Sequence, residues 1–208
     1  MMKFKEECKT VAAIMRRLYK QNLTTSSGGN VSMKNSDGFV FITASRTDKS
    51  SIKWKDIIVI DSTGKNMTPD LKPSMETVMH LEIYKTRPDV FAIVHAHPVY
   101  ASTFAVAGIQ PQSSFTGESR FILGEIVMTN YKLMGSEELA HECAKSLEKS
   151  ETAILKNHGA VCIGNSIFEA YNRMEVLEMT CKIHFNTLLI NCCNVLSEKE
   201  VKKIDDMK

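Results

Sequence analysis

Long apolar stretches are missing from this sequence of 208 residues. The longest ones, such as residues 57–60 and 91–94, have the length of a β-strand and fall far short of the roughly 18 residues that a membrane span requires. The first ten residues mix charged and polar side chains, where a secretory signal would need an apolar segment of about 7–15 residues. The sequence therefore predicts a cytoplasmic protein with no membrane contact.

Neither sign of charge dominates. The chain has 26 Lys and Arg residues against 24 Asp and Glu residues, a net charge of +2, which leaves no electrostatic footprint for nucleic acid. It also lacks a Walker loop and a GxGxxG segment after a strand, and the pair Gly28-Gly29 alone is a weak signal for a nucleotide. Small molecules or proteins are the expected partners.

Cysteine pairs with the CxxC spacing are absent too. The six cysteines are scattered, which in a chain without an export signal indicates reduced thiols, most of them packed in the core. They are Cys8, Cys143, Cys162, Cys181, Cys192 and Cys193.

The elements that are present predict an α/β fold in one folding unit over residues 1–208, because no break in composition divides the chain. Residues 31–34 and 39–43 flank an Asn-Ser-Asp-Gly turn and predict a β-hairpin, and residues 57–61 predict a further strand. A hairpin and a further strand near the start of the chain favour an antiparallel or mixed sheet over a doubly wound parallel one.

Apolar periodicity and turn signals predict the remaining elements. Residues 107–125 read largely as a loop rich in Gly, Ser and Gln, and the charged tail after Ser197 as a short helix or a frayed end. Helices are expected at about 4–20, 74–87, 101–107, 137–149 and 167–190, and strands at 90–97, 125–128, 152–155 and 160–163.

Three histidines suggest a metal site. His95 and His97 stand two apart at the end of a predicted strand, so both imidazoles project to the same side, as chelation requires. His158 lies in an Asn-His-Gly turn between two apolar strands and offers a third donor. Taken singly, each also fits an ordinary polar residue at a strand end or a turn.

Glu76 follows Pro73 and is expected in the first turn of a helix, where the helix dipole favours a carboxylate. Three imidazoles and one carboxylate are the set that a catalytic zinc site uses when one position stays open for substrate. His80 lies four residues after Glu76 on the same helix face. It is a packing residue, a ligand, or a donor that orients the carboxylate.

Four motifs occur in a familiar order: Gly28-Gly29-Asn30-Val31-Ser32, Lys72-Pro73-Ser74-Met75-Glu76, Val94-His95-Ala96-His97 and Lys156-Asn157-His158-Gly159. Together they resemble the class II aldolase/adducin family, from the first helix to about Ser197. The resemblance implies a three-layer α/β/α fold around a mainly antiparallel sheet. It also implies a homotetramer with active sites between neighbouring subunits.

The resemblance further implies roles for single residues. His95, His97 and His158 match the zinc ligands of the family, and Glu76 matches the residue that is both a metal ligand and the acid/base. The phosphate pocket of the family falls on Gly29, Asn30, Ser45, Arg46, Ser74 and Met75.

Three of these positions depart from the family pattern. The family usually has Thr-Gly where this chain has Ser45-Arg46, and a second Ser where it has Met75. Arginine binds phosphate or carboxylate in a bidentate way, so Arg46 either changes the preference of the anion site or points to solvent. A tyrosine that assists proton transfer in the family falls near Phe115, which lacks a hydroxyl.

The implied activity is zinc-dependent, reversible cleavage of a ketose 1-phosphate, such as a deoxyketose phosphate, into dihydroxyacetone phosphate and an aldehyde, through a metal-stabilised enediolate. Zinc is the expected ion, and another divalent transition metal is the alternative. The rival functions are a 4-epimerase, a dehydratase or a decarboxylase of the same family, a non-catalytic adducin-like scaffold, and a Schiff-base aldolase using Lys156. The glutamate at position 76 favours the aldolase over the epimerase, in which aspartate is usual.

Overall fold

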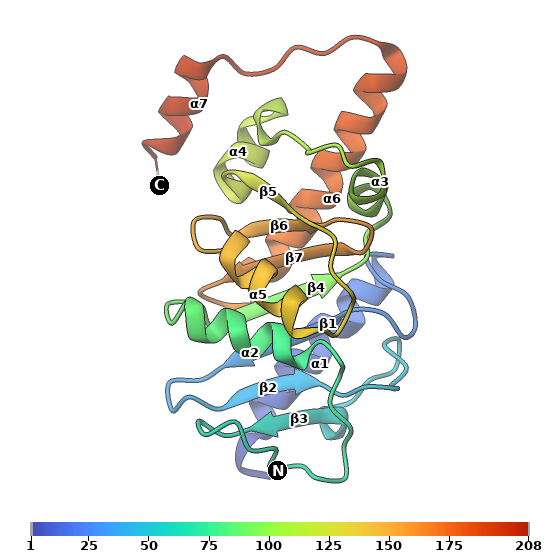
Figure 1. Cartoon of the computed structure of the whole chain (residues 1–208), viewed down its shortest axis with the longest axis vertical. Coiled ribbons are helices and arrows are strands. Elements are labelled where there is room, and N and C mark those ends of the chain that lie inside the picture. The colour runs from blue at the N-terminus through green and yellow to red at the C-terminus, as the bar shows by residue number, and fades with distance from the viewer. Residues whose placement is uncertain (1, 208) are drawn as a thin grey trace.

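A seven-stranded sheet runs through the molecule in a computed structural model that describes residues 2–207 (Figure 1). The spatial order is β3-β2-β1-β4-β7-β6-β5, so β4, which carries His95 and ends just before His97, lies at its centre, with β7, which begins just after His158, beside it. The strands are β1 (Asn30–Lys34), β2 (Val40–Thr43), β3 (Ile57–Ile60), β4 (Ala92–Ala96), β5 (Ile126–Thr129), β6 (Thr152–Leu155) and β7 (Gly159–Gly164).

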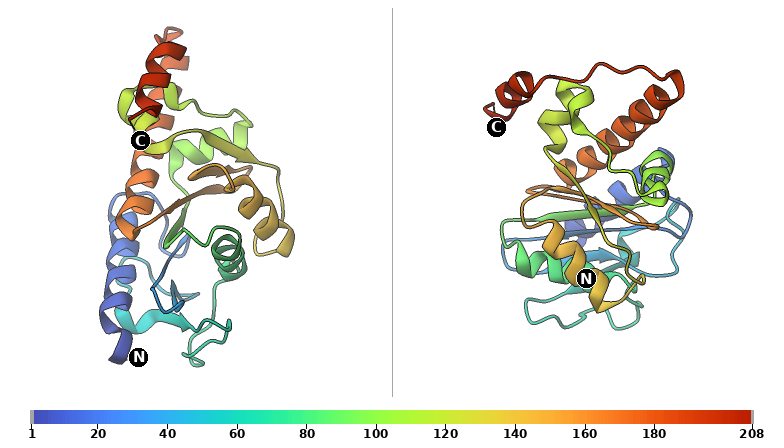
Figure 2. Two further views of the ribbon diagram at one scale, coloured as in Figure 1. Left: turned by 90° about the vertical axis from the view of Figure 1, so that its left-hand side faces the viewer. Right: turned by 45° about the horizontal axis from the view of Figure 1, so that its top comes forward.

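Helices cover both faces of the sheet, which gives three layers (Figures 1 and 2). One face carries α1 (Lys5–Lys20) and α6 (Ile167–Ile190), with α3 (Val99–Ala107) and α4 (Gly117–Leu123) packed against α6. The other face carries α2 (Thr77–Thr86) and α5 (Glu137–Ser146). The last helix, α7 (Glu198–Asp205), packs against α4, and short 3-10 turns occupy Met2–Phe4, Trp54–Asp56 and Ser113–Phe115.

The sheet is mixed, which corrects the expectation of a mainly antiparallel one. Strands β5 and β6 are parallel, with Ile126 opposite Thr152, whereas the neighbours from β3 to β6 pair antiparallel. Parallel neighbours need a long crossover, and α5 supplies it between β5 and β6. A mixed sheet was one of the two alternatives that the opening hairpin left open.

Helix α4 lies where the sequence predicted loop. Gly117 in its first turn hides the helical pattern, but Thr116 caps it by accepting a hydrogen bond from the Ser119 amide at 3.1 Å. The helix is held by packing, because Ser119 and Leu123 are buried and the Ser119 hydroxyl contacts Thr180 of α6 at 2.7 Å. Among residues 2–207, no helix combines the length and the apolar content needed to cross a membrane.

Alternation along β4 assigns its side chains to the two layers. Ala92, Val94 and Ala96 face the core beneath α1 and α6, whereas Ile93 faces the core beneath α2 and α5. His95, two residues after Ile93, therefore points to the α2 side, and the site is built on that face.

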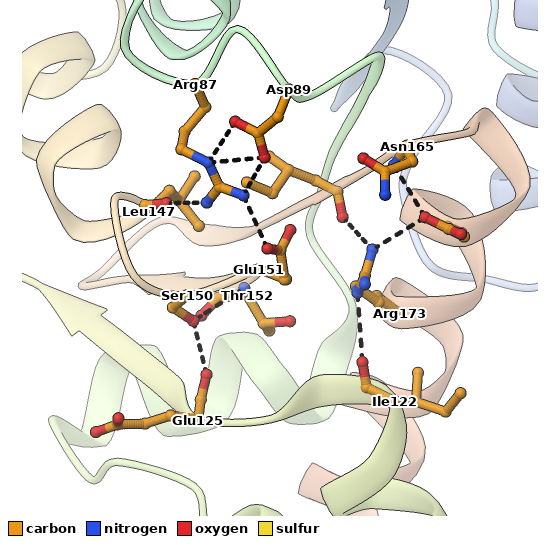
Figure 3. Close-up of polar contacts among 12 residues, drawn as sticks. Arg87, Asp89, Ile122, Glu125, Leu147, Ser150, Glu151, Thr152, Asn165 and Arg173 are labelled. Atoms are coloured by element: carbon orange, nitrogen blue, oxygen red, sulfur yellow. Dashed lines mark hydrogen bonds and ion pairs between the residues drawn. The ribbon is translucent and has the colours of Figure 1, made fainter. Parts of the chain in front are cut away.

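The end of α2 opposite Glu76 is fixed by Arg87 (Figure 3). Its guanidinium donates to both oxygens of Asp89, to Glu151 at 2.9 Å and to the Leu147 carbonyl at 2.7 Å. The side chain is 16% exposed, so these bonds are partly shielded from water. They join α2, the end of α5 and the start of β6.

We expect Arg87→Met to lower the free energy of unfolding by about 2 kcal/mol, because it leaves two carboxylates and a carbonyl without their donor. For a chain of this length the loss corresponds to roughly 4–8 °C in melting temperature, measurable by calorimetry. Lys85→Met is the control, since the Lys85–Glu82 pair is exposed on the Lys85 side and should contribute little. Equal melting temperatures for the two variants would contradict the role of Arg87.

Candidate metal centre and anion pocket

Strand register brings the predicted residues together. In the antiparallel pair β4–β7, Ala96 lies opposite Ala160, so His97 and His158, one step beyond each strand, lie side by side. In the pair β1–β4, Asn30 lies opposite His95. The ends of β1, β4 and β7 thus lie next to one another in the middle of the sheet, and the residues at these ends meet there.

The three imidazoles form a tight group. One ligating atom from each of His95, His97 and His158 lies within 4.8 Å of the others. The ring of His95 stands 4.8 Å, centroid to centroid, from both the His97 and His158 rings. Within residues 2–207 this is the only group of three or more His, Cys, Asp or Glu side chains placed to share a metal ion.

Glu76 joins this group from the N-terminus of α2. Its two carboxylate oxygens lie 3.2 Å from Nε2 of His95 and 3.0 Å from Nε2 of His158. The residue is the N-cap of the helix, one position before its first turn, which corrects the sequence-based placement. The cap position leaves the side chain free to turn toward the strand ends.

The donor atoms fit a cation. His95 donates from Nδ1 to the Ala160 carbonyl at 2.9 Å, which leaves Nε2 as the atom that faces the group. Nε2 of His95 and Oε1 of Glu76 are buried and have no hydrogen-bond partner, although they lie close to other polar atoms. Buried lone pairs without donors are costly, and a shared cation removes that cost.

The electrostatics of the group point the same way. Burial raises the pKa of Glu76, but His95 and His158 outweigh burial, so this pKa lies well below its ordinary value. Burial lowers the pKa of His95, yet the charge of Glu76 leaves it above its ordinary value. Burial, then the charges of His95 and His158, lower the pKa of His97 to about 3. The site therefore holds an ionised carboxylate whose field favours a positive charge between the rings.

Two glycines allow this crowding. Gly29 has a φ of +66°, and a Cβ there would lie 2.7 Å from the His95 carbonyl oxygen. A Cβ on Gly159 would lie 2.5 Å from the Ala96 carbonyl oxygen and 2.6 Å from the His97 ring. Larger residues at either position would push the histidines out of place.

The predicted anion residues are brought together in part. The Asn30 side-chain nitrogen lies 2.8 Å from Glu76 and 3.4 Å from the Ser74 hydroxyl. The Ser45 amide donates to the Lys72 carbonyl at 2.9 Å, so the loop of Ser45 runs beside the loop of Ser74.

Arg46 and Met75 are both exposed. Arg46 has a φ of 58°, in the left-handed region that suits the glycine of the family pattern. Its side chain makes no hydrogen bond or ion pair with any residue that the structure describes. Met75 is 66% exposed and lies against Gly135.

Sequence reasoning missed two members of the site and left the place of a third open. His80 contacts neither the carboxylate of Glu76 nor the other imidazoles: its ring nitrogens lie 2.5 Å from Asn30 and 2.7 Å from Ser32. Ser32 in turn contacts the Tyr84 hydroxyl at 2.8 Å. The missed residues, Ser32 and Tyr84, were signalled by their spacing: Ser32 follows Asn30 by two in a strand, and Tyr84 follows His80 by four in a helix.

An open hollow of about 680 Å³ adjoins the imidazoles, and it is lined by His97, His158 and the exposed side of α3. Val99 and Val106 on that helix are 63% and 67% exposed. The site therefore has one polar wall, made by the imidazoles, and one apolar wall.

The sequence model of the family described as "Class II Aldolase and Adducin N-terminal domain" matches residues 9–185, most of the chain. The chain belongs to this family. An L-fuculose phosphate aldolase of Methanococcus vannielii is 37% identical over 86% of this chain and 95% of its own length. A 3-oxo-tetronate 4-phosphate decarboxylase of Haemophilus influenzae is 29% identical over 92% of each chain.

A solved structure of this class II aldolase family is similar over nearly the whole chain. It is an L-fuculose 1-phosphate aldolase that superposes with a TM-score of 0.89 at 29% identity, covering 97% of this chain and 95% of its own. Relatives in the family thus include both aldolases and decarboxylases of sugar phosphates, in agreement with the resemblance drawn from the four motifs.

We expect His158→Ala to weaken zinc binding at least about 100-fold, because it removes one donor of a small ligand set. Metal analysis of the purified variant and competition with a chromogenic chelator measure the change. His141→Ala is the matched control, since that ring is exposed on α5 and contacts Glu82 at 3.2 Å. Full zinc occupancy in His158→Ala would remove His158 from the ligand set.

Proposed function

We propose that this chain is a zinc-dependent aldolase that cleaves a ketose 1-phosphate, L-fuculose 1-phosphate or a related deoxyketose phosphate, into dihydroxyacetone phosphate and an aldehyde. The observation that carries the proposal is the group of three imidazoles with a buried, ionised carboxylate between two of them. The aldolases among the relatives support the reaction type. A cytoplasmic location belongs to the same proposal.

His95, His97 and His158, with Glu76, would hold the metal. When bound, the cation supplies the positive charge that offsets the negative charge developing on the substrate ketone as the carbon–carbon bond breaks. This route needs no lysine Schiff base, and Lys156 has no role in it.

Glu76 is the acid/base of the proposal. Its low pKa keeps it ionised, so it can accept the proton of the substrate hydroxyl that becomes the aldehyde carbonyl and deliver a proton to the carbon of the enediolate left by cleavage. The amide of Asn30 holds the Glu76 oxygen at 2.8 Å, which limits the directions in which the carboxylate can face.

The anion pocket would bind the phosphate. Asn30 and Ser74 already contact each other, and the backbone bond between Ser45 and Lys72 sets the second loop beside them. Phosphate held here fixes the sugar relative to Glu76, so that remote binding energy orients the reacting carbons. Gly29, Arg46 and Met75 would complete the rim.

A second subunit would close the site. The hollow beside His97 has an apolar wall with Val99 and Val106 exposed, and apolar surface next to a polar centre is suited to a protein contact. We propose a homotetramer in which a neighbouring subunit covers this wall.

Decarboxylation of a 3-oxo sugar-acid phosphate is the second candidate. The guanidinium of Arg46 is exposed and unpaired within the described chain, so it could bind a substrate carboxylate that an aldolase substrate lacks. A decarboxylase among the relatives supports this reading.

A substrate panel separates the candidates. Zinc-loaded protein is incubated with ketose 1-phosphates, with 3-oxo-tetronate 4-phosphate and with ribulose 5-phosphate, each with a chelator control. Release of dihydroxyacetone phosphate together with an aldehyde from a ketose 1-phosphate supports the aldolase. Decarboxylation of 3-oxo-tetronate 4-phosphate also leaves dihydroxyacetone phosphate, but with carbon dioxide in place of an aldehyde. Carbon dioxide release without aldehyde release from any ketose 1-phosphate, epimerisation alone or no reaction would overturn the aldolase. A protein that binds no zinc and turns over nothing would be the adducin-like scaffold.

We expect Glu76→Gln to lower turnover by roughly 10²–10⁴-fold, because glutamine cannot carry the proton, while zinc stays bound to the three histidines. Steady-state kinetics and metal analysis of the same sample measure both effects. Glu82→Gln on the same helix is the control and should leave turnover unchanged. Substantial residual activity in Glu76→Gln would remove Glu76 from the chemistry.

We expect Arg46→Gly to stabilise the fold and to weaken substrate binding. Glycine relieves a left-handed φ that costs another residue about 1 kcal/mol. Loss of the guanidinium should raise KM about tenfold, or about 1.4 kcal/mol. Arg46→Lys should keep only part of the affinity, because it keeps the charge and loses the bidentate geometry of the guanidinium. An unchanged KM in Arg46→Gly would mean that Arg46 points to solvent in the complex as well.

A further inference from the structure

A line of buried hydrogen bonds runs from Glu76 away from the metal site, between β1 and α2. Its contacts are Glu76–Asn30 at 2.8 Å, Asn30–His80 at 2.5 Å, His80–Ser32 at 2.7 Å and Ser32–Tyr84 at 2.8 Å. The five residues are at most 9% exposed, and His80 and Ser32 are fully buried. Water cannot replace any of these partners without opening the core.

The direction of each bond follows from the carboxylate at one end. An ionised Glu76 only accepts, so the Asn30 amide presents its NH₂ to Glu76 and its oxygen to His80. His80 must then carry a proton on Nε2 to donate to that oxygen. In the neutral ring Nδ1 accepts from Ser32, and Ser32 accepts from the Tyr84 hydroxyl. Every donor in the line has one acceptor.

We infer that His80 is a positioning residue: as a neutral imidazole protonated at Nε2, it locks the Asn30 amide with its NH₂ toward Glu76. The ring is fully buried, and no carboxylate contacts it among residues 2–207, so a charged ring would lack compensation. Ser32 and Tyr84 fix the tautomer from the other side. The inference rests on the proposed role of Glu76 as acid/base.

Without the donor at position 80, the Asn30 side-chain amide could flip, so that its oxygen and its NH₂ group exchange places. Its oxygen would then face the Glu76 carboxylate, and two acceptors at 2.8 Å repel each other. The carboxylate would move from its place between His95 and His158, so proton transfer would slow. Substrate binding would weaken less, because Asn30 is the one residue of the proposed phosphate pocket that turns, while the loops of Ser45 and Ser74 stay in place.

Two amide substitutions separate positioning from packing. The amide of glutamine reaches the place of Nε2 of histidine, so His80→Gln keeps a donor for Asn30. The amide of asparagine reaches only the place of Nδ1, so His80→Asn keeps a partner for Ser32 and leaves Asn30 unheld. Both replace a buried ring by a smaller polar side chain, and both should cost some stability.

We expect kcat of His80→Asn to fall by about 10²-fold, because a misplaced catalytic group costs on this order. KM should rise by no more than about tenfold, because Asn30 is one of several proposed contacts to the phosphate. His80→Gln should retain kcat within about fivefold, which is the rescue that a packing role does not predict. Kinetics are corrected for the folded fraction from circular dichroism. Equal kcat in the two variants would overturn the inference.

Nitrogen-15 spectra of the zinc-loaded wild type give a second readout that needs no substrate. The signal lost in His80→Gln identifies His80, and we expect a protonated Nε2 and an unprotonated Nδ1. The Asn30 side-chain NH₂ should give a resolved, slowly exchanging pair in the wild type and in His80→Gln but not in His80→Asn. A proton on Nδ1 with a bare Nε2, or an Asn30 signal indifferent to position 80, would overturn the inference. If the wild type cleaves no sugar phosphate, the proposed function fails. These spectra still test whether His80 is protonated at Nε2 and orients the Asn30 amide.

Discussion

The arrangement depends on an unbalanced set of buried acceptors. Nε2 of His95 and Oε1 of Glu76 are buried without a hydrogen-bond partner, while Nε2 of His95 lies 3.2 Å from Oε2 of Glu76 and Nε2 of His158 lies 3.0 Å from Oε1. Such a set is unfavourable by itself, and it becomes favourable once a divalent cation takes the centre. The pairing of β4 with β7 and with β1 enforces the set, because the same backbone bonds that build the sheet bring the three strand ends together. The fold thus gathers three imidazoles and a carboxylate around the place that the proposed metal ion would take.

Helix α2 connects this centre to the rest of the molecule. At one end its N-cap delivers Glu76 to the strand ends, and at the other Arg87 binds Asp89, Glu151 and the Leu147 carbonyl. The helix is therefore fixed at both termini, and its inner face lies on β1. Rigid placement matters for the proposed role of this carboxylate in proton transfer, since small displacements at a reacting centre have large effects on rate.

The sequence predicted the features that depend on neighbouring residues, but it did not predict those that depend on tertiary packing. The His-x-His spacing in β4, the Asn-His-Gly turn and most elements were readable, because alternation and turn residues act over a few positions. Helix α4 was missed, because Gly117 weakens its pattern and contacts with α6 hold it. The parallel pairing of β5 with β6 was missed, because strand neighbours are chosen at long range. The contacts of His80 were left open for the same reason: spacing placed it on the face of Glu76, but only the packing of α2 on β1 shows that Asn30 and Ser32 occupy both ring nitrogens.

The contact between α2 and β1, the seam between them, constrains which insertions and deletions the two segments can accept. Four residues of helix advance by about 6 Å, and two residues of strand by about 6.6 Å. The residues that face each other are therefore spaced almost equally along the two segments. Glu76, His80 and Tyr84 on one side thereby interleave with Asn30 and Ser32 on the other. Inserting or deleting a single residue within either segment would turn the residues beyond it away from their hydrogen-bond partners on the other segment. Length variation is therefore expected in the connecting loops and not along this seam.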